Sequence, residues 1–180
     1  MKVSEFKAES LPQLFLDMDG VLCDLYDVVT TAYNVDNYKL ISSSQMEKFF
    51  LDSDAEELFA NLPPFKTNNE LLTLIDNTFG SYTILSSPLQ YDYASSIRGK
   101  KRWLKYHIPD MVNAPIFDSQ KYMYAKQADG TPNILIDDYG KNIRLWNEYG
   151  GIGIKWQANE QDISELKSLI DEAIFEFCLD

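Results

Sequence analysis

Short, continuously apolar segments alternate along this chain with longer segments of helical periodicity. An unbroken apolar run is typical of a strand that is buried on both faces of a parallel sheet. We expect such strands at residues 13–17, 81–87, 114–117, 133–136 and 151–156, and helices at 53–62, 67–79, 91–107, 141–149 and 162–179. Strands that alternate with helices predict an α/β fold whose parallel strands are joined by right-handed crossovers.

Polar side chains follow three of these strands at the point where each strand ends. In such sheets the ligand crevice lies at the carboxyl ends of the strands, so these side chains are candidates for one active site. They are Asp17 and Asp19 after the first strand, Ser86 and Ser87 at the end of the second, and Asp137 and Asp138 at the end of the fourth.

Composition and charge exclude several classes of protein. The length of 180 residues suits one domain with a small insertion, and the net charge of −12 argues against binding to long nucleic acid. The single histidine, His107, lies in a lysine-rich helical stretch, so we expect it at a solvated helix end. Two cysteines, Cys23 and Cys178, make neither a disulfide framework nor a zinc cluster. The polar N-terminus and the absence of a long apolar run lead us to expect a cytoplasmic protein without membrane contact.

Carboxylates gathered in one crevice repel one another and need a cation. All the candidate ligands are oxygens, which favours Mg²⁺ bound together with a substrate phosphate. One aspartate next to that phosphate can attack phosphorus, and a second can transfer protons. A close backbone N–H at Gly20, a serine hydroxyl and a lysine would stabilise the charge.

The same motifs resemble those of the haloacid dehalogenase (HAD) superfamily of phosphohydrolases, with DMDGVLCD as the first motif, ILSS as the second and ILIDD as the fourth. The similarity is greatest to the 5′(3′)-deoxyribonucleotidase branch, through the SSP triplet, the KKRWLKYHIP helix and Lys126. The resemblance implies a Rossmann-like parallel sheet flanked by helices, with a small helical cap inserted after the first strand. It places the α/β core at residues 1–24 and 80–180 and the cap at residues 25–79.

Residue roles follow from this resemblance by position. Asp17 would be the nucleophile and Asp19 the general acid and base. Mg²⁺ would be held by Asp17, by the backbone carbonyl of Asp19, and by one of Asp137 and Asp138. The phosphate would contact Gly20, Ser86, Ser87 and Lys126, while Lys100, Lys101 and Lys105 are competitors for the lysine role that we expect on a helix face.

The expected cap is rich in aromatic side chains, and in this branch such residues sandwich the base of the substrate. Stacking on a base is physically reasonable because every base has a π face, although a single aromatic residue more often belongs to a hydrophobic core. The candidates for substrate binding are Tyr26, Phe49, Phe50 and Phe59. The segment LPPFKTNNE lacks the glycine that this branch usually carries before the next helix.

Together these observations predict a Mg²⁺-dependent phosphomonoesterase that acts on nucleoside monophosphates, with deoxyribonucleotides as the expected substrates. A phosphatase of sugar phosphates or other small metabolites keeps the same chemistry and stays open. A polynucleotide 3′-end phosphatase is disfavoured by the acidic charge, and a HAD-like domain that binds without turnover by the complete set of carboxylates. The expected partner is a small phosphomonoester, and a homodimer is a further expectation.

Overall fold

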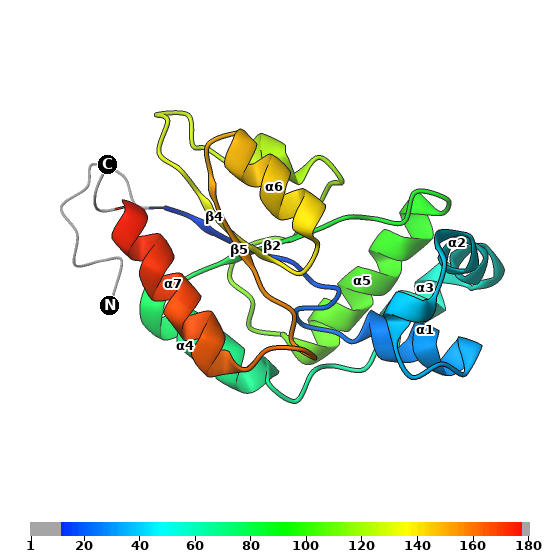
Figure 1. Ribbon diagram of the computed structural model, residues 1–180. Helices are drawn as coiled ribbons and strands as arrows, with labels where there is room; N and C mark the ends of the chain where they lie inside the picture. Colours follow the sequence, from blue (N-terminus) through cyan, green and yellow to red (C-terminus); the bar gives the residue numbers. More distant parts are fainter. Residues whose placement is uncertain (1–11, 178–180) are drawn as a thin grey trace. The chain divides into compact units, whose positions relative to one another are not determined.

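The computed structural model describes residues 12–177 and contains a five-stranded parallel sheet in the order β3-β2-β1-β4-β5 (Figure 1). The α/β architecture expected from the sequence is therefore confirmed, and each strand falls inside or at the edge of its expected range. The strands are β1 (Leu14–Leu16), β2 (Thr83–Ser86), β3 (Ile116–Phe117), β4 (Ile134–Asp137) and β5 (Ile152–Lys155).

Strand β1 lies at the centre of the sheet, as its apolar composition predicts. Its three residues are no more than 4% exposed, so both faces of the strand are covered. Leu16 pairs with Ile84 on β2 and with Ile136 on β4. The next residue, Asp17, therefore leaves the sheet at the carboxyl edge, between the ends of two neighbouring strands.

The chain divides into two compact units, but not at the expected boundary. Unit 1 holds the chain up to residue 22, residues 65–87, and the chain from residue 112, while unit 2 holds residues 23–64 and 88–111. The expected cap of residues 25–79 thus differs in two ways. The helix that ends at Phe79 belongs with the sheet, and the helix that ends at His107 belongs with the smaller unit.

Helices cover the sheet of unit 1 on both faces. Helices α4 and α7 lie side by side, with α7 against β5, whereas α6 packs on β4, on β5 and on the short 3₁₀ helix η3. Figure 1 shows α6 on the face of the sheet opposite to α4 and α7. These elements are α4 (Asn68–Phe79), η3 (Lys121–Tyr124), α6 (Gly140–Glu148) and α7 (Ile163–Phe177).

The closing helix α7 shows why the sequence pattern predicts it. Its buried positions, Ile163, Leu166, Ile170 and Ile174, recur every three or four residues and so form one apolar stripe. The preceding Asp162 caps the helix, because its Oδ1 accepts a 2.9 Å hydrogen bond from the backbone N–H of Glu165.

A second apolar cluster lies under α6. Phe15, Leu85, Leu135 and Trp146 pack together there, with the Trp146 ring edge-on to Phe15 at a centroid distance of 5.5 Å. Trp146 also donates a 3.0 Å hydrogen bond from Nε1 to the carbonyl of Asn133. These contacts make Trp146 part of the core of unit 1.

Asn133, just before β4, uses all of its polar groups to join separate elements. Its Nδ2 and backbone N–H donate 2.8 Å hydrogen bonds to the carbonyls of Tyr124 and Ala125, at the end of η3. Its Oδ1 accepts from the N–H of Gln13 at 3.1 Å, and its carbonyl accepts from the N–H of Ile152. The side chain therefore fixes η3 to the amino-terminal side of the sheet.

Unit 2 consists of helices joined by loops. Its longest helix, α5, packs closely on α3, which explains the shifted boundary. A Cβ at Gly99 of α5 would overlap the backbone carbonyl oxygen of Glu56 in α3 and lie 3.0 Å from the Cβ of Phe59, so only glycine permits this approach. Trp103 of α5 donates a 2.8 Å hydrogen bond to the carbonyl of Leu62. The elements are α1 (Leu25–Tyr33), η2 (Tyr38–Leu40), α2 (Ser43–Asp52), α3 (Ala55–Ala60) and α5 (Tyr93–His107).

Three further expectations concern single features. Cys23 is buried and fully shielded from solvent, while Cys178 lies outside the described residues. His107 ends α5, as predicted, but is partly buried. Within residues 12–177, no helix combines the length and apolarity needed to cross a membrane.

Candidate active site

Three carboxylates meet at the carboxyl edge of the sheet. Asp17 follows β1, Asp137 ends β4 and Asp138 follows it, and one oxygen of each lies within 4.8 Å of the others. All three residues are buried, with at most 7% of their surface exposed. The structure thus brings together three of the four carboxylates that the sequence singled out as a cluster.

A buried lysine neutralises part of this cluster. The Nζ of Lys121 lies 2.7 Å from Oδ1 of Asp17 and 2.6 Å from Oδ2 of Asp137, and the residue is 2% exposed. Burial lowers the pKa of Lys121, but the two carboxylates outweigh it, so the pKa is raised above its ordinary value. Lys121 is therefore a permanent cation that bridges two strand ends.

The structure does not bring Lys126, the lysine chosen from the sequence, to these carboxylates. Lys126 is exposed, and its side chain extends over Gly150, where an added Cβ would lie 2.6 Å from Nζ. The choice rested on spacing to Asp137 along a loop. That loop contains η3 and a turn closed by a hydrogen bond from Gln127 N–H to the carbonyl of Thr131, so spacing does not fix which lysine points inward.

Asp137 is held in place by several hydrogen bonds. Its Oδ1 accepts a 2.8 Å hydrogen bond from the backbone N–H of Tyr139, and its Oδ2 accepts a 2.9 Å hydrogen bond from Nδ2 of Asn142. With Lys121, three donors fix the orientation of this side chain, which is fully buried. The sequence analysis missed Asn142, although its place in the first turn of the helix after Asp137 was a usable signal.

Gly20 lies against the cluster for two steric reasons. Its φ of +78° is in the left-handed region, which favours glycine. An added Cβ would also lie 2.6 Å from Cγ of Asp138. Glycine at this position therefore lets the turn after β1 pack directly on the Asp138 carboxylate, and its predicted contact with phosphate stays a prediction.

The remaining predicted residues of the core lie on the same edge. Ser86 ends β2 and is fully buried, and its carbonyl accepts a 3.2 Å hydrogen bond from the N–H of Asp118 after β3. Ser87 and Asp19 are partly exposed. The partial exposure of Asp19 contrasts with the burial of Asp17 and is compatible with exchange of protons with substrate and water.

The donor set fits a divalent cation. Three ionised carboxylates and one ammonium leave a net charge of −2 in a buried place, and a doubly charged cation would balance it. Every ligand in the cluster is an oxygen, which suits a hard ion such as Mg²⁺. Asp17, Asp137 and Asp138 are the residues that would hold it.

The four aromatic candidates all belong to unit 2. The rings of Tyr26 and Tyr38 stack at 4.0 Å, and Phe49 meets Phe50 edge-on at 5.6 Å. Tyr26, Phe49 and Phe50 are partly exposed. Their contact with substrate stays a prediction.

Phe59 differs from the other three because it is a core residue of unit 2. It is 3% exposed, its ring stacks with Phe50 at 6.4 Å, and Nζ of Lys100 lies 4.7 Å from its centroid. These contacts occupy the ring within the unit. We therefore withdraw Phe59 from the candidates for base stacking.

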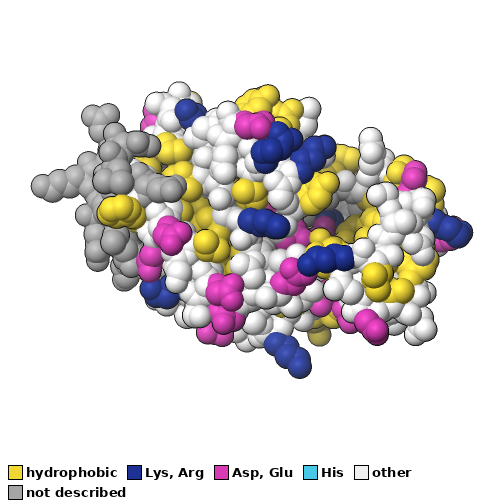
Figure 2. All heavy atoms as spheres, in the orientation of Figure 1, with side chains coloured by type: hydrophobic (Ala, Val, Ile, Leu, Met, Phe, Trp, Pro, Cys, Tyr) yellow, Lys and Arg dark blue, Asp and Glu magenta, His cyan; other side chains and the backbone are white. Residues whose placement is uncertain are grey.

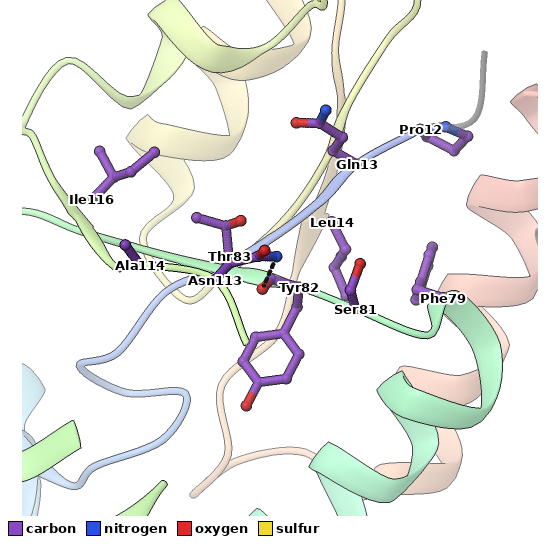
Figure 3. Close-up of a pocket in the computed structure, with 10 residues that line it drawn as sticks. All are labelled: Pro12, Gln13, Leu14, Phe79, Ser81, Tyr82, Thr83, Asn113, Ala114 and Ile116. Carbon is purple, nitrogen blue, oxygen red and sulfur yellow. Dashed lines mark hydrogen bonds between the residues drawn. The ribbon is translucent and has the colours of Figure 1, made fainter. Parts of the chain in front are cut away.

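A cavity of about 500 Å³ in unit 1 lies at the opposite edge of the sheet (Figure 3). Its lining comes from the residues that begin β1, β2 and β3, and Figure 3 shows the 2.8 Å hydrogen bond from Asn113 Nδ2 to the carbonyl of Tyr82. Burial, and then the carboxylate of Asp76, raise the pKa of Tyr82. The cavity contains none of the carboxylates of the cluster, so it is not part of the candidate active site.

Comparisons with known proteins agree with this fold. Residues 11–163 match the family described as 5′ nucleotidase, deoxy (pyrimidine), cytosolic type C protein. A search of curated proteins gave no match.

Solved structures share the fold at low sequence identity. A HAD family enzyme from Bacteroides thetaiotaomicron, solved as a complex with magnesium and inorganic phosphate, has a TM-score of 0.54 at 15% identity, covering 86% of this chain and 98% of that one. A hydrolase from Streptococcus pneumoniae has a TM-score of 0.51 at 12% identity, covering 88% and 97%. These likenesses confirm the HAD fold. Since the family match spans most of the chain, the protein belongs to the cytosolic type C family of 5′ nucleotidases and is a HAD-type phosphatase.

Proposed function

We propose that this protein is a Mg²⁺-dependent phosphatase of nucleoside monophosphates, with deoxyribonucleotides as its preferred substrates. The observation that carries the proposal is the bridge of Lys121 between Asp17 and Asp137, beside Asp138, at the carboxyl edge of the sheet. This arrangement unites a nucleophile, a fixed cation and a set of oxygen ligands in one buried cluster. The family match supports a nucleotide as substrate.

In the first step, a carboxylate oxygen of Asp17 attacks the substrate phosphorus and forms an aspartyl phosphate. The bond between phosphorus and the ester oxygen breaks, and the leaving oxygen takes a proton from the carboxylic acid of Asp19. Burial of Asp17 keeps bulk water from competing with it for phosphorus.

In the second step, Asp19, now a carboxylate, takes a proton from a water molecule. The water oxygen attacks phosphorus, the acyl phosphate bond breaks, and inorganic phosphate and the Asp17 carboxylate are released. Asp19 is then protonated again, ready for the next substrate.

The charge of the transferring phosphoryl group needs fixed positive partners. Lys121 supplies one such charge without rearrangement, because its position is already set by two carboxylates. Ser86, at the end of β2, is the candidate for a hydroxyl contact. A bound divalent cation would supply Lewis-acid stabilisation to the phosphate oxygens.

The aromatic side chains of unit 2 support a substrate that carries a base. Tyr26, Phe49 and Phe50 are partly exposed, and aromatic rings stack on any base at about 1–3 kcal/mol each. A long polynucleotide is a poorer substrate on electrostatic grounds. On the face shown in Figure 2, Lys and Arg side chains are interspersed with acidic ones and form no broad basic surface among the described residues.

The test is phosphate release from deoxyribonucleoside monophosphates, ribonucleoside monophosphates and sugar phosphates, each with Mg²⁺ and with EDTA. We expect deoxyribonucleotide turnover that requires Mg²⁺. Asp17→Asn should lower kcat by at least about 10³-fold. The matched control, Asp36→Asn, changes an exposed aspartate of unit 2 and should leave kcat unchanged.

Each result bears on a different part of the proposal. Turnover of sugar phosphates alone would keep the aspartyl phosphate mechanism and overturn the nucleotide assignment. Turnover that persists in Asp17→Asn would overturn the mechanism. The cytoplasmic location and a homodimer remain predictions that fractionation and sedimentation of the native protein would check.

A further inference from the structure

A cavity of about 720 Å³ lies wholly within unit 2, where the segment after α3 faces the last turns of α5. Its volume falls in the range of about 300–1,000 Å³ that is usual for small-molecule sites. None of its described lining residues carries a carboxylate, although the chain as a whole has a net charge of −12. The cavity is therefore a local exception to the acidic character of the protein.

One wall of this cavity is apolar and stiff. Leu62, Pro63 and Pro64 form it, and the two proline rings restrict the backbone. The carbonyl of Leu62 accepts the hydrogen bond from Nε1 of Trp103, and the carbonyl of Pro63 accepts one from the N–H of Asp24 at 2.8 Å. These contacts hold the wall in place before any ligand arrives.

The opposite wall carries two cationic side chains that differ in availability. Arg102 contacts Glu57 at 2.6 Å and Glu56 at 3.4 Å, so its charge is partly neutralised and its position is fixed. Lys105 is exposed, and its ammonium group forms no ion pair or hydrogen bond with any residue that the structure describes. Lys105 is thus the ammonium that can bind an anion.

Aromatic side chains complete the lining. Tyr106 is 82% exposed, which is unusual for a large ring. The imidazole of His107 lies 4.4 Å from the Trp103 ring and 4.8 Å from that of Tyr106, measured between centroids. Burial lowers the pKa of His107 and so favours the uncharged imidazole, which offers one donor and one acceptor.

We propose that this cavity is a second ligand site, separate from the carboxylate cluster, for a small organic anion in which a flat ring carries a phosphate or a carboxylate group. The ring would lie against Pro63, Pro64 and Tyr106, and the anionic group would bind Lys105. The volume exceeds what a free inorganic anion fills. Burial of the ring against the apolar wall would contribute to the binding free energy.

The test uses the single histidine of the chain as its reporter. Because His107 is the only histidine and lines the cavity, its imidazole gives one unambiguous set of NMR signals. The full-length Asp17→Asn protein in EDTA, which prevents turnover, would be titrated with AMP, benzoate, adenosine and inorganic phosphate. We expect saturable shifts with AMP, with benzoate or with both, at lower concentration than with adenosine or phosphate. The pair of ring-bearing anions separates the phosphate source from the carboxylate source.

Two variants show whether the response comes from this cavity. Lys105→Ala should weaken the response at least about tenfold, since a charge-assisted contact is lost. Lys101→Ala, which alters an exposed lysine of the same helix that does not line the cavity, should leave it unchanged. Chemical shifts of backbone amides would verify that both variants are folded.

Two results would overturn the proposal. One is the absence of saturation by either ring-bearing anion up to about 10 mM, which corresponds to negligible affinity. The other is a His107 response that is equal in Lys105→Ala and in the parent, because the ligand would then act from elsewhere. Neither result depends on whether the protein hydrolyses nucleotides.

Discussion

Among the described residues, each unit of the molecule contains one buried lysine, and the two lysines lie in different surroundings. In unit 1, Lys121 is 2% exposed and lies between the carboxylates of Asp17 and Asp137. In unit 2, Lys100 has no exposed surface and lies over the ring of Phe59. Lys121 is held by a pair of carboxylates at the end of the sheet, and this contact makes it the candidate for catalysis.

The largest expected difference between the two lysines comes from Lys121→Met. Loss of the cation leaves buried carboxylates uncompensated, which costs about 3–5 kcal/mol of the free energy of unfolding, and removes a fixed charge from the transferring phosphoryl group. We expect kcat to fall about 10²–10³-fold. Thermal unfolding in EDTA and in Mg²⁺ would measure stability, and Mg²⁺ should restore part of it.

The control for this variant is Lys167→Met, which breaks a surface ion pair with Asp171. Such exposed pairs contribute about 0–1 kcal/mol, so its effect should be small. If Lys121→Met retained the parental kcat, the distinction between the two buried lysines would disappear.

A smaller effect is expected from Asn142→Ala, which removes one of the three donors to Asp137. The side chain acts through Asp137 rather than on the substrate, so it is a positioning residue. We expect the Mg²⁺ concentration for half-maximal activity to rise about 10- to 100-fold, with kcat at saturating Mg²⁺ less affected. Asn69→Ala, at an exposed position of α4, is the matched control. An unchanged Mg²⁺ requirement would show that the other two donors suffice.

Lys100→Met should act on stability instead of chemistry. Methionine keeps much of the aliphatic stem but loses the cation over Phe59, a contact worth about 1–2 kcal/mol when desolvated. Denaturant unfolding should detect this loss, while kcat stays within about threefold of the parent. A fall in kcat as large as that of Lys121→Met would mean that both lysines serve the reaction.

The smallest effect is expected from Lys126→Ala, at the lysine that the family resemblance had favoured. Its side chain is exposed and lies over Gly150, so kcat/KM should stay within about twofold of the parent. Assayed beside Lys121→Met, this variant compares the two assignments directly. Loss of activity in Lys126→Ala with retention in Lys121→Met would reverse our correction.

The alternation of strands with helices and the edge where the site lies follow from local sequence, because apolar runs such as residues 14–16 are typical of strands buried in a parallel sheet. Asp17, Asp137 and Asp138 could be predicted for the same reason, since each directly follows or ends such a run. Lys121 could not, because it lies on a short 3₁₀ helix without apolar periodicity. The grouping of α5 with α3 also escaped prediction, since it depends on close packing at Gly99 that only three-dimensional contacts reveal.

The hydrogen bonds of Asn133 determine how the loop between η3 and β4 can change in length. Asn133 fastens the end of η3 to the sheet. Lys121 is therefore positioned by this contact and not by its distance in sequence from Asp137. Residues 127–131, which close a separate turn, lie between that anchor point and Asn133. Insertions or deletions confined to this turn should leave kcat unchanged. Related chains can then be aligned on the pair formed by the lysine and the asparagine, and an engineered loop exchange should transplant both.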